Sequence, residues 1–290
     1  MLKIQIVGVV RDVEHVIKKE FNYVEKIFKN FGEVNTFLVE SDSIDQTVDC
    51  LSELSRSNAH FSFKSLGVLE NEIPNRYGRI AYCREVYLEY VKNLQTKLDY
   101  VVVVDLDGMN HNLTVDAVKS TLENQDRWDA VFANQAGRYY DIGALRHSIW
   151  SPIDCFAAYD WALSVADAQS AKLFGVQSKM LKIRKNAGMI AVDSAYGGLG
   201  IYKANVFKLS SYIGTDLYQN PILDFVCFNL FLSKNNYKLM IDSQLINCKY
   251  NSHNAGSTFI FKAFRNLSKS LPSTTTKSLI KRIVINLLSK

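Results

Sequence analysis

Short apolar runs alternate with helical periodicities along the first half of the chain. Continuous or alternating apolar residues predict strands at 3–10, 36–39, 61–69, 101–104 and 130–133. Apolar positions at helical spacing predict helices between them, at 16–31, 47–56, 79–94 and 116–122. Right-handed crossovers through such helices make the connected strands parallel. The pattern therefore predicts an α/β fold, with a Rossmann-like, mostly parallel central sheet flanked by helices.

The second half of the chain is less regular. It contains an aromatic segment at 138–156, a glycine-rich turn at 195–202, a helix at 223–233 and a strand at 238–241. No repeat or low-complexity linker divides it, and the only hinge-like stretch is 268–278. We therefore predict one domain over 1–255 and a short appendage over 256–290.

An acidic pair ends the four-valine run, in the segment VVVVDLDG. The valines predict a strand buried on both faces, because they are β-branched and do not alternate with polar residues. Asp105 and Asp107 then lie at the carboxyl edge of the sheet, where open α/β folds bind ligands. Two such carboxylates can hold one hard divalent cation and leave positions for phosphate oxygens. A plain strand-to-loop junction, with aspartate as a turn former, is the alternative.

Composition narrows the class of protein. The chain has 290 residues, of which 48% are hydrophobic and 22% charged, as in ordinary globular proteins. No apolar run reaches the ~20 residues that span a bilayer, and the first residues lack the cleavage region of a signal peptide, so we expect a cytoplasmic protein. The five cysteines are scattered and have no CxxC spacing, so we expect reduced thiols without a disulfide framework or a zinc site.

The net charge of +5 comes from the carboxyl-terminal part of the chain. Eight basic residues and no acid follow Ser243, so the rest of the chain is slightly acidic. Nucleic-acid-binding proteins more often spread basic groups over the folded body, so we expect no nucleic-acid partner. A basic tail more often meets an anionic surface.

A polar loop, ESDSIDQT, follows the predicted strand at 36–39. Glu40, Asp42 and Asp45 are placed there to accept hydrogen bonds from a ribose or a base, and Ser43 and Thr47 can cap the next helix. A capped loop without a ligand explains the same residues.

The polar loop after the second strand and the Asp-x-Asp pair after a later strand together resemble the GT-A glycosyltransferases, over nearly all of 1–255. Other segments resemble one branch, the capsule and surface-polysaccharide glycosyltransferases distantly similar to fungal capsule-associated mannosyltransferases. These segments are, in order, RIAYCREVYLEYV, YYDIGALRHSIW, AVDSAYGGLGIYKANVF, LDFVCFNLFL and LINCKYNSH. Glu85 and Phe225 depart from the pattern of that branch, which leaves the subfamily and the donor sugar open.

The chemistry of that family needs a site for a nucleotide-diphosphate sugar. The leaving diphosphate carries negative charge that a divalent ion and nearby cations must stabilise. Asp105 and Asp107 would hold Mn²⁺ or Mg²⁺, and His253 is either a further ligand or a structural hydrogen-bonding group. Arg79 and Arg84 would reach the diphosphate or the sugar, unless they are ordinary surface arginines of their helix.

Three further positions each have a functional and a structural interpretation. Asp141 and Arg146 would hold donor or acceptor hydroxyls, or would pair and shape their loop. Gly197 and Gly198 would let the backbone approach the sugar, or would form a plain tight turn. Asp224 would deprotonate the acceptor hydroxyl, or would cap its helix. A base there would give inversion, whereas the resemblance implies retention, so the stereochemistry stays open.

The expected function is transfer of a hexose from a UDP- or GDP-sugar to a hydroxyl of a growing surface glycan of the capsule, lipopolysaccharide or O-antigen type. A sugar-nucleotide nucleotidyltransferase is the alternative on the same architecture. It usually has a glycine-rich loop with a lysine after the first strand, whereas VGVVRDVEH has no such loop. The intact acidic pair argues against a third candidate, an inactive transferase-like scaffold.

The tail combines apolar and basic residues at helical spacing over 278–288. Such a helix can lie in the headgroup layer of an anionic membrane, which fits a lipid-linked glycan acceptor and a peripheral position on the inner face of the membrane. The alternative is that its apolar stripe packs on the domain or on another subunit of an oligomer.

Overall fold

A single sheet of eight strands runs through residues 1–214 and 223–249, the part of the chain that this computed structural model describes. The strand order is β3-β2-β1-β4-β7-β5-β8-β6. The strands are β1 (Leu2–Val10), β2 (Gly32–Glu40), β3 (Phe61–Ser65), β4 (Tyr100–Val104), β5 (Ala130–Gln135), β6 (Met189–Ala191), β7 (Leu199–Lys203) and β8 (Leu239–Cys248).

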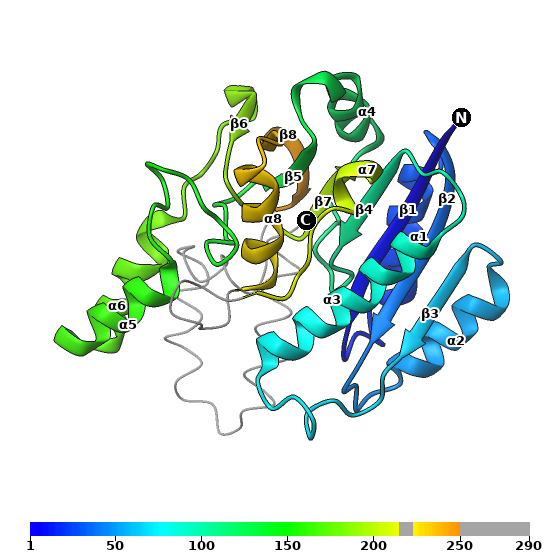
Figure 1. The fold of residues 1–290 in the computed structure, drawn as a ribbon, viewed down its shortest axis with the longest axis horizontal. Coiled ribbons are helices and arrows are strands. Elements are labelled where there is room, and N and C mark those ends of the chain that lie inside the picture. Colours follow the sequence, from blue (N-terminus) through cyan, green and yellow to red (C-terminus); the bar gives the residue numbers. More distant parts are fainter. Residues whose placement is uncertain (215–222, 250–290) are drawn as a thin grey trace.

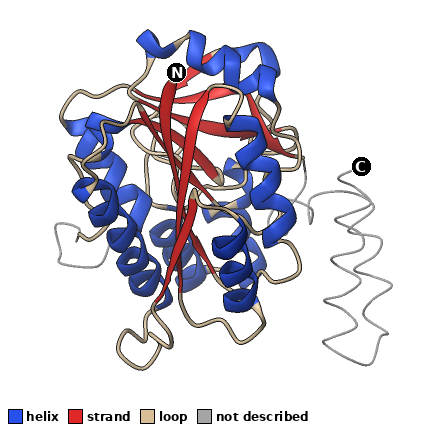
Figure 2. Cartoon of the chain, turned by 90° about the vertical axis from the view of Figure 1, so that its right-hand side faces the viewer, coloured by secondary structure: helices blue, strands red, loops and turns tan. Residues whose placement is uncertain are grey.

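Helices cover both faces of this sheet (Figures 1 and 2). They are α1 (Ile17–Phe28), α2 (Thr47–Ser57), α3 (Arg76–Asn93), α4 (Val115–Glu123), α5 (Cys155–Val165), α6 (Ala168–Gly175), α7 (Ala204–Phe207) and α8 (Asp224–Lys234). None of the helices in the described ranges is both long enough and apolar enough to cross a membrane.

The sheet is mostly parallel, as the sequence pattern predicts. Neighbouring strands among β3, β2, β1 and β4 pair in parallel, and so do β5 and β8. β7 is antiparallel between β4 and β5, and β6 is antiparallel at the edge. The predicted α/β fold class is therefore confirmed.

The four valines of β4 connect the two hydrophobic cores. Successive side chains of a strand point to opposite faces, so Val101 and Val103 enter the core under α3 and α8. Val102 and Val104 enter the core under α1 and α4. All four are fully buried, which explains the absence of any polar residue between them.

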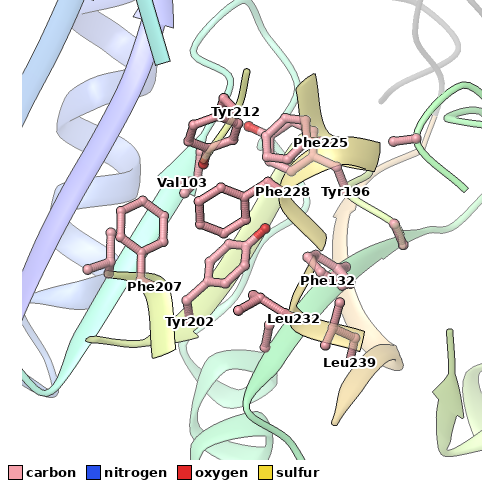
Figure 3. Packing of buried hydrophobic residues seen from close by; sticks show 14 of the residues in the cluster. Val103, Phe132, Tyr196, Tyr202, Phe207, Tyr212, Phe225, Phe228, Leu232 and Leu239 are labelled. Carbon is pink, nitrogen blue, oxygen red and sulfur yellow. The ribbon is translucent and has the colours of Figure 1, made fainter. Parts of the chain in front are cut away.

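Aromatic side chains from β7, α7 and α8 fill much of one core (Figure 3). The rings of Tyr212 and Phe228 stack with their centroids 4.3 Å apart. Tyr202 meets Phe228 edge-on at 5.6 Å, and Phe207 lies 5.2 Å from it. Phe228 is therefore the central ring of this group.

Three parts of the fold differ from the expectation from sequence. The second strand covers Gly32–Glu40 and the last one Leu239–Cys248, so both are longer than predicted. β7 lies inside the sheet, although its sequence was expected to belong to a glycine-rich turn. α5 and α6 were not predicted, because apolar residues occur on their exposed side too and remove the one-sided periodicity.

The five cysteines all lie in the described ranges, and the structure shows no disulfide among them. The appendage predicted at 256–290, with its membrane or subunit contact, lies outside the described residues.

We predict that Phe228→Ala lowers the free energy of unfolding by about 3–5 kcal/mol, because it leaves a cavity among the rings of Figure 3. Urea unfolding measures this change. The matched control is Phe231→Ala on the same helix, where the ring is 46% exposed and the loss should stay below about 1 kcal/mol. Equal losses in the two variants would contradict this account of the core.

Candidate functional site

A cleft with a volume of about 230 Å³ opens at the carboxyl ends of β1, β2 and β4. β1 lies between β2 and β4 in the sheet, so the order of strands reverses there, and open α/β sheets bind ligands at such a switch point. Helix α3 forms one wall. The cleft is lined by Val9, Val10, Arg11, Val13, Ser41, Asp42, Arg76, Arg79, Ile80, Cys83, Arg84, Asp105, Leu106 and Asp107.

The acidic pair lies in this cleft directly after β4. The Tyr196 hydroxyl donates a hydrogen bond to Asp105 Oδ1 over 2.9 Å. The Asp105 backbone N–H donates to the Gly198 carbonyl, also over 2.9 Å. Asp105 is 31% exposed at its side chain, and Asp107 is exposed. Both carboxylates are therefore accessible from the cleft.

Negative charge is concentrated at this end of the cleft. Burial raises the pKa of Asp105 to about 7; Arg84 opposes the rise and Asp107 adds to it. Desolvation in the cleft and the charge of Glu20 raise the pKa of Asp107 to about 6. Such shifts mean that the ionised pair is poorly solvated and that Arg84 compensates only part of its negative charge.

The acidic pair fits a hard divalent cation, because it offers carboxylate oxygens and a deficit of positive charge. Within the described residues, no group of three or more His, Cys, Asp or Glu side chains could hold a metal. Further ligands would therefore come from substrate phosphates, from water or from outside these ranges. His253, the predicted additional ligand, lies outside them.

A buried glutamate, Glu20 of α1, holds the loop that carries the pair. Its Oε1 accepts hydrogen bonds from the Asn110 backbone N–H at 2.8 Å and from Asn110 Nδ2 at 2.9 Å. Its Oε2 accepts one from the Gly108 N–H. Gly108 has a φ of +97°, which favours glycine in the turn after Asp107. Glu20 thus determines where the acidic pair lies.

Arg84 of α3 lies behind the pair and is almost completely buried. Its Nε forms an ion pair and hydrogen bond with Asp224 Oδ2. Its Nη2 is 3.8 Å from Asp105 Oδ1. Its guanidinium carbon lies 4.1 Å from the centre of the Phe225 ring. The structure therefore brings together three predicted site residues, Arg84, Asp105 and Asp224.

Asp224 is the first residue of α8, as expected. It is buried, and no side-chain hydrogen bond caps this helix, so the capping alternative is not what the structure shows. Arg84 occupies one of its two carboxylate oxygens. The position near Arg84 and Asp105 leaves its predicted role as a base open to experiment.

Arg79 and Asp42 pair with each other and with main-chain groups of the protein. Arg79 Nε is 3.2 Å from Asp42 Oδ2, and its Nη1 donates to two main-chain carbonyls of the loop before α3. Asp42 Oδ1 accepts from the N–H groups of Leu69 and Glu70. Glu40 is buried and accepts from the Ser43 N–H and the Ser65 hydroxyl. These contacts shape the wall of the cleft beside the acidic pair.

Asp141 supports the glycine turn at the same edge of the sheet. Its Oδ2 accepts from the Gly197 N–H at 3.0 Å. Gly197 and Gly198 have φ values of +72° and +85°, and a Cβ on Gly197 would lie 2.7 Å from the Ala133 carbonyl oxygen. The turn therefore requires glycine and also approaches the sheet closely, beside Asp105.

Arg146 contacts the start of α5, whereas Asp141 contacts the glycine turn. Its Nη2 forms an ion pair with Asp154, which caps the amino end of α5. Its Nη1 donates to the carbonyls of Gly143 and Leu145. Arg146 therefore anchors α5 to the loop before it.

Sequence reasoning missed Glu20 and Tyr196. Glu20 had a detectable signal, because it is an acid on the apolar face of the predicted helix at 16–31, where an ionisable group needs partners. Tyr196 had none: its contact with Asp105 spans 91 positions, and its ring stacks on Phe225 at 3.7 Å.

No family model matches the sequence, and no curated protein matches it. Among solved structures, the chain is similar to S. aureus TarS in complex with UDP-GlcNAc, at 14% identity and a TM-score of 0.46, over 92% of this chain and 65% of that one. It is also similar to the mannosyltransferase PcManGT from Pyrobaculum calidifontis in complex with GDP-Man and Mn²⁺, at 12% identity and a TM-score of 0.46, over 97% and 68%.

A third similar structure is glucosyl-3-phosphoglycerate synthase from Mycobacterium tuberculosis, in complex with Mn²⁺, UDP and phosphoglyceric acid. The identity is 12% and the TM-score 0.43, over 94% of this chain and 80% of that one. This chain spans less than two thirds of the TarS chains it matches, 58% in one case.

We predict that the metal-free protein loses stability as the pH rises from about 5 to about 7.5. The pKa of Asp105 is about 7 in the folded state against an ordinary value of 3.8, so the folded state binds more protons in this window and stability falls with pH. Asp107→Asn should reduce this fall by on the order of 1 kcal/mol, because Asp107 raises the pKa of its neighbour. Urea unfolding in EDTA at several pH values measures the fall in stability for the wild type and for Asp107→Asn. The exposed Asp126→Asn is the control. An unchanged slope in Asp107→Asn would refute the coupling.

We predict that Glu20→Gln lowers the free energy of unfolding by about 1–3 kcal/mol, because the buried N–H groups of Gly108 and Asn110 lose a charged acceptor. Urea unfolding at pH 7.5 measures it. Glu53→Gln, which breaks an exposed ion pair with Lys18, should cost less than about 1 kcal/mol. A loss for Glu20→Gln no larger than this control would rule out the positioning role.

Proposed function

We propose that this protein is a metal-dependent glycosyltransferase that moves a hexose from a UDP- or GDP-sugar to a glycan hydroxyl. The observation that supports it best is the position of Asp105 and Asp107, which line a cleft at the switch point of a mostly parallel sheet. A nucleotide diphosphate needs such a cleft, with an anion-binding cation at one end and further cations beside it.

Asp105 and Asp107 would hold Mn²⁺ or Mg²⁺, with His253 as an additional ligand. The ion supplies charge stabilisation for the departing diphosphate. Glu20 keeps the two carboxylates in place through the N–H groups of the following loop. Tyr196 orients Asp105 by donating to its Oδ1, which leaves Oδ2 for a cation.

Cations of the chain itself would also contact the donor. Arg11 and Arg76 are exposed on the cleft wall, where Arg11 forms an exposed ion pair with Asp12, and both would turn toward phosphate oxygens. Arg84 is buried and acts at the far side of Asp105. Arg79 is held by Asp42 and by main-chain carbonyls, so we assign it to the wall of the donor site and to its shape.

The remaining predicted residues would act on the sugar and the base. Glu40 and Asp42 shape the loop after β2 where the ribose and base would lie. Gly197 and Gly198, held by Asp141, present backbone atoms beside Asp105. Asp224 would accept the proton of the acceptor hydroxyl, with its carboxylate oriented by Arg84. Arg146 would act indirectly, through the start of α5.

The finer parts of the proposal come from the sequence, either from the family resemblance or from the pattern of the tail. The resemblance suggests a surface glycan as acceptor and similarity to the capsule-associated branch. The pattern of residues suggests one catalytic domain at 1–255, a basic amphipathic tail at 256–290 and a peripheral position on the inner membrane face. A nucleotidyltransferase is the second candidate, and the segment after β1, which begins with Arg11 and Asp12, offers no glycine-rich cradle for a triphosphate.

We predict that UDP or GDP raises the melting temperature of the protein only when Mn²⁺ or Mg²⁺ is present, because a ligand stabilises the state it binds. CMP serves as the nucleotide control. Asp107→Ala should keep the fold, abolish the metal-dependent shift and lower donor hydrolysis or transfer about 100-fold or more. The exposed Asp126→Ala should leave both unchanged. Full activity of Asp107→Ala, or of the wild type in excess EDTA, would refute the proposal.

A further inference from the structure

The α5–α6 hairpin exposes an unusual number of large apolar side chains. It stands at the left of Figure 1, at the side of the molecule away from β1, β2 and β3. Six of its large apolar side chains are between 40% and 69% exposed: Phe156, Trp161, Leu163, Val165, Leu173 and Phe174. Large apolar side chains exposed in this number on one short hairpin mark an interaction site.

The hairpin is a packed unit that holds these side chains outward. α6 approaches α5 so closely that a Cβ on Gly175 would lie 2.8 Å from the backbone of Tyr159. The rings of Trp161 and Phe174 lie side by side, with centroids 5.5 Å apart. The indole N–H of Trp150 donates to the Lys179 carbonyl at 2.6 Å, which ties the end of the hairpin to the aromatic loop. The exposed rings therefore belong to a supported surface.

Positive charge borders the apolar surface. Three lysines lie in α6 and the segment directly after it: Lys172, Lys179 and Lys182. Two of the three nearby acids are engaged, since Asp154 pairs with Arg146 and caps α5, and Asp167 caps α6. The third acid, Asp160, is exposed. With Asp154 paired to Arg146, the three lysines outnumber Asp160 and Asp167, so the charge near the exposed apolar side chains is net positive.

We propose that the α5–α6 hairpin docks on an anionic lipid surface, with its exposed aromatic and aliphatic side chains in the headgroup layer. Trp and Phe beside lysines are the residues that enter this layer, and the cations add attraction to anionic lipids. A two-fold contact between two copies would instead bring the same cations of both hairpins together. Charge complementarity thus favours the lipid over a second copy.

The hairpin is next to the rim of the cleft. Phe156 at the start of α5 lies 5.9 Å, centroid to centroid, from Tyr77 in the first turn of α3. Tyr77 follows Arg76, which lines the cleft. Docking of the hairpin would therefore bring the cleft close to the lipid surface. Docking through the hairpin requires neither the transferase reaction nor residues of the tail.

Co-sedimentation of the full chain with vesicles tests the proposal. We expect binding to vesicles of phosphatidylcholine with phosphatidylglycerol, and binding at least about tenfold weaker for Trp161→Ser/Phe174→Ser, which removes the two adjacent rings. Lys172→Glu/Lys182→Glu, at two exposed cations, should also weaken it and should remove the preference over pure phosphatidylcholine.

The matched control is Leu209→Ser. This side chain is 49% exposed and follows α7. The first N–H of α7 donates to the carbonyl of Asp99, just before β4, so α7 lies at the edge of the sheet opposite the cleft. It should bind vesicles like the wild type. Near-UV circular dichroism checks the fold of each variant. If Trp161→Ser/Phe174→Ser does not fold, the binding of Lys172→Glu/Lys182→Glu decides the outcome.

Three results would overturn the proposal: no binding of the wild type to the anionic vesicles, wild-type binding by both hairpin variants, or a dimer that Trp161→Ser/Phe174→Ser dissociates. The last result would assign the hairpin to a protein interface. Nucleotide-dependent thermal shifts need no vesicles, so failure here and failure of the proposed transferase reaction are distinguishable.

Discussion

The buried guanidinium of Arg84 is the contact on which the candidate site depends. It comes from α3 and meets Asp224 at the start of α8 and Asp105 at the end of β4, so one cation joins both halves of the chain. Removing one partner of a buried ion pair typically costs 3–5 kcal/mol, because the other charge stays buried. Phe225 lies against its face, and Tyr87 accepts a hydrogen bond from its Nη1 at 3.0 Å. The position of the acidic pair relative to α8 therefore follows from a single side chain.

The site also carries more negative than positive charge, and this excess favours the binding of a cation. Three carboxylates, Glu20, Asp105 and Asp107, act on one another at the carboxyl edge of β4, and desolvation raises the pKa of each. Arg84 compensates only part of this negative charge from behind. Repulsion between carboxylates destabilises the empty site, so a cation that relieves it binds with additional free energy. The same feature that costs stability would favour a divalent ion.

The side chains that line the cleft differ in their conformational freedom. Asp42 and Arg79 are fixed by one another and by main-chain groups, whereas Arg11 and Arg76 are exposed on the wall. The buried, hydrogen-bonded side chains fix the shape of the cleft, whereas the exposed arginines can change conformation to pair with a bound anion. The α5–α6 hairpin begins beside this wall and is anchored through Arg146 and Asp154, so a surface that holds the hairpin would also hold the cleft.

The sequence by itself determined the α/β class, the parallel first half and the place of Asp105 and Asp107 at the end of a buried strand. These features depend on local patterns, because side-chain alternation, helical spacing and the end of an apolar run can be seen within a few residues. Only the tertiary structure decided that Glu20 holds the acidic loop, that Tyr196 contacts Asp105, and that Arg84 joins Asp105 to Asp224. It also decided that β7 enters the sheet antiparallel and that α5 and α6 form an exposed hairpin. These contacts join residues about 90 to 140 positions apart, or depend on which face a partner covers, and no local pattern encodes either.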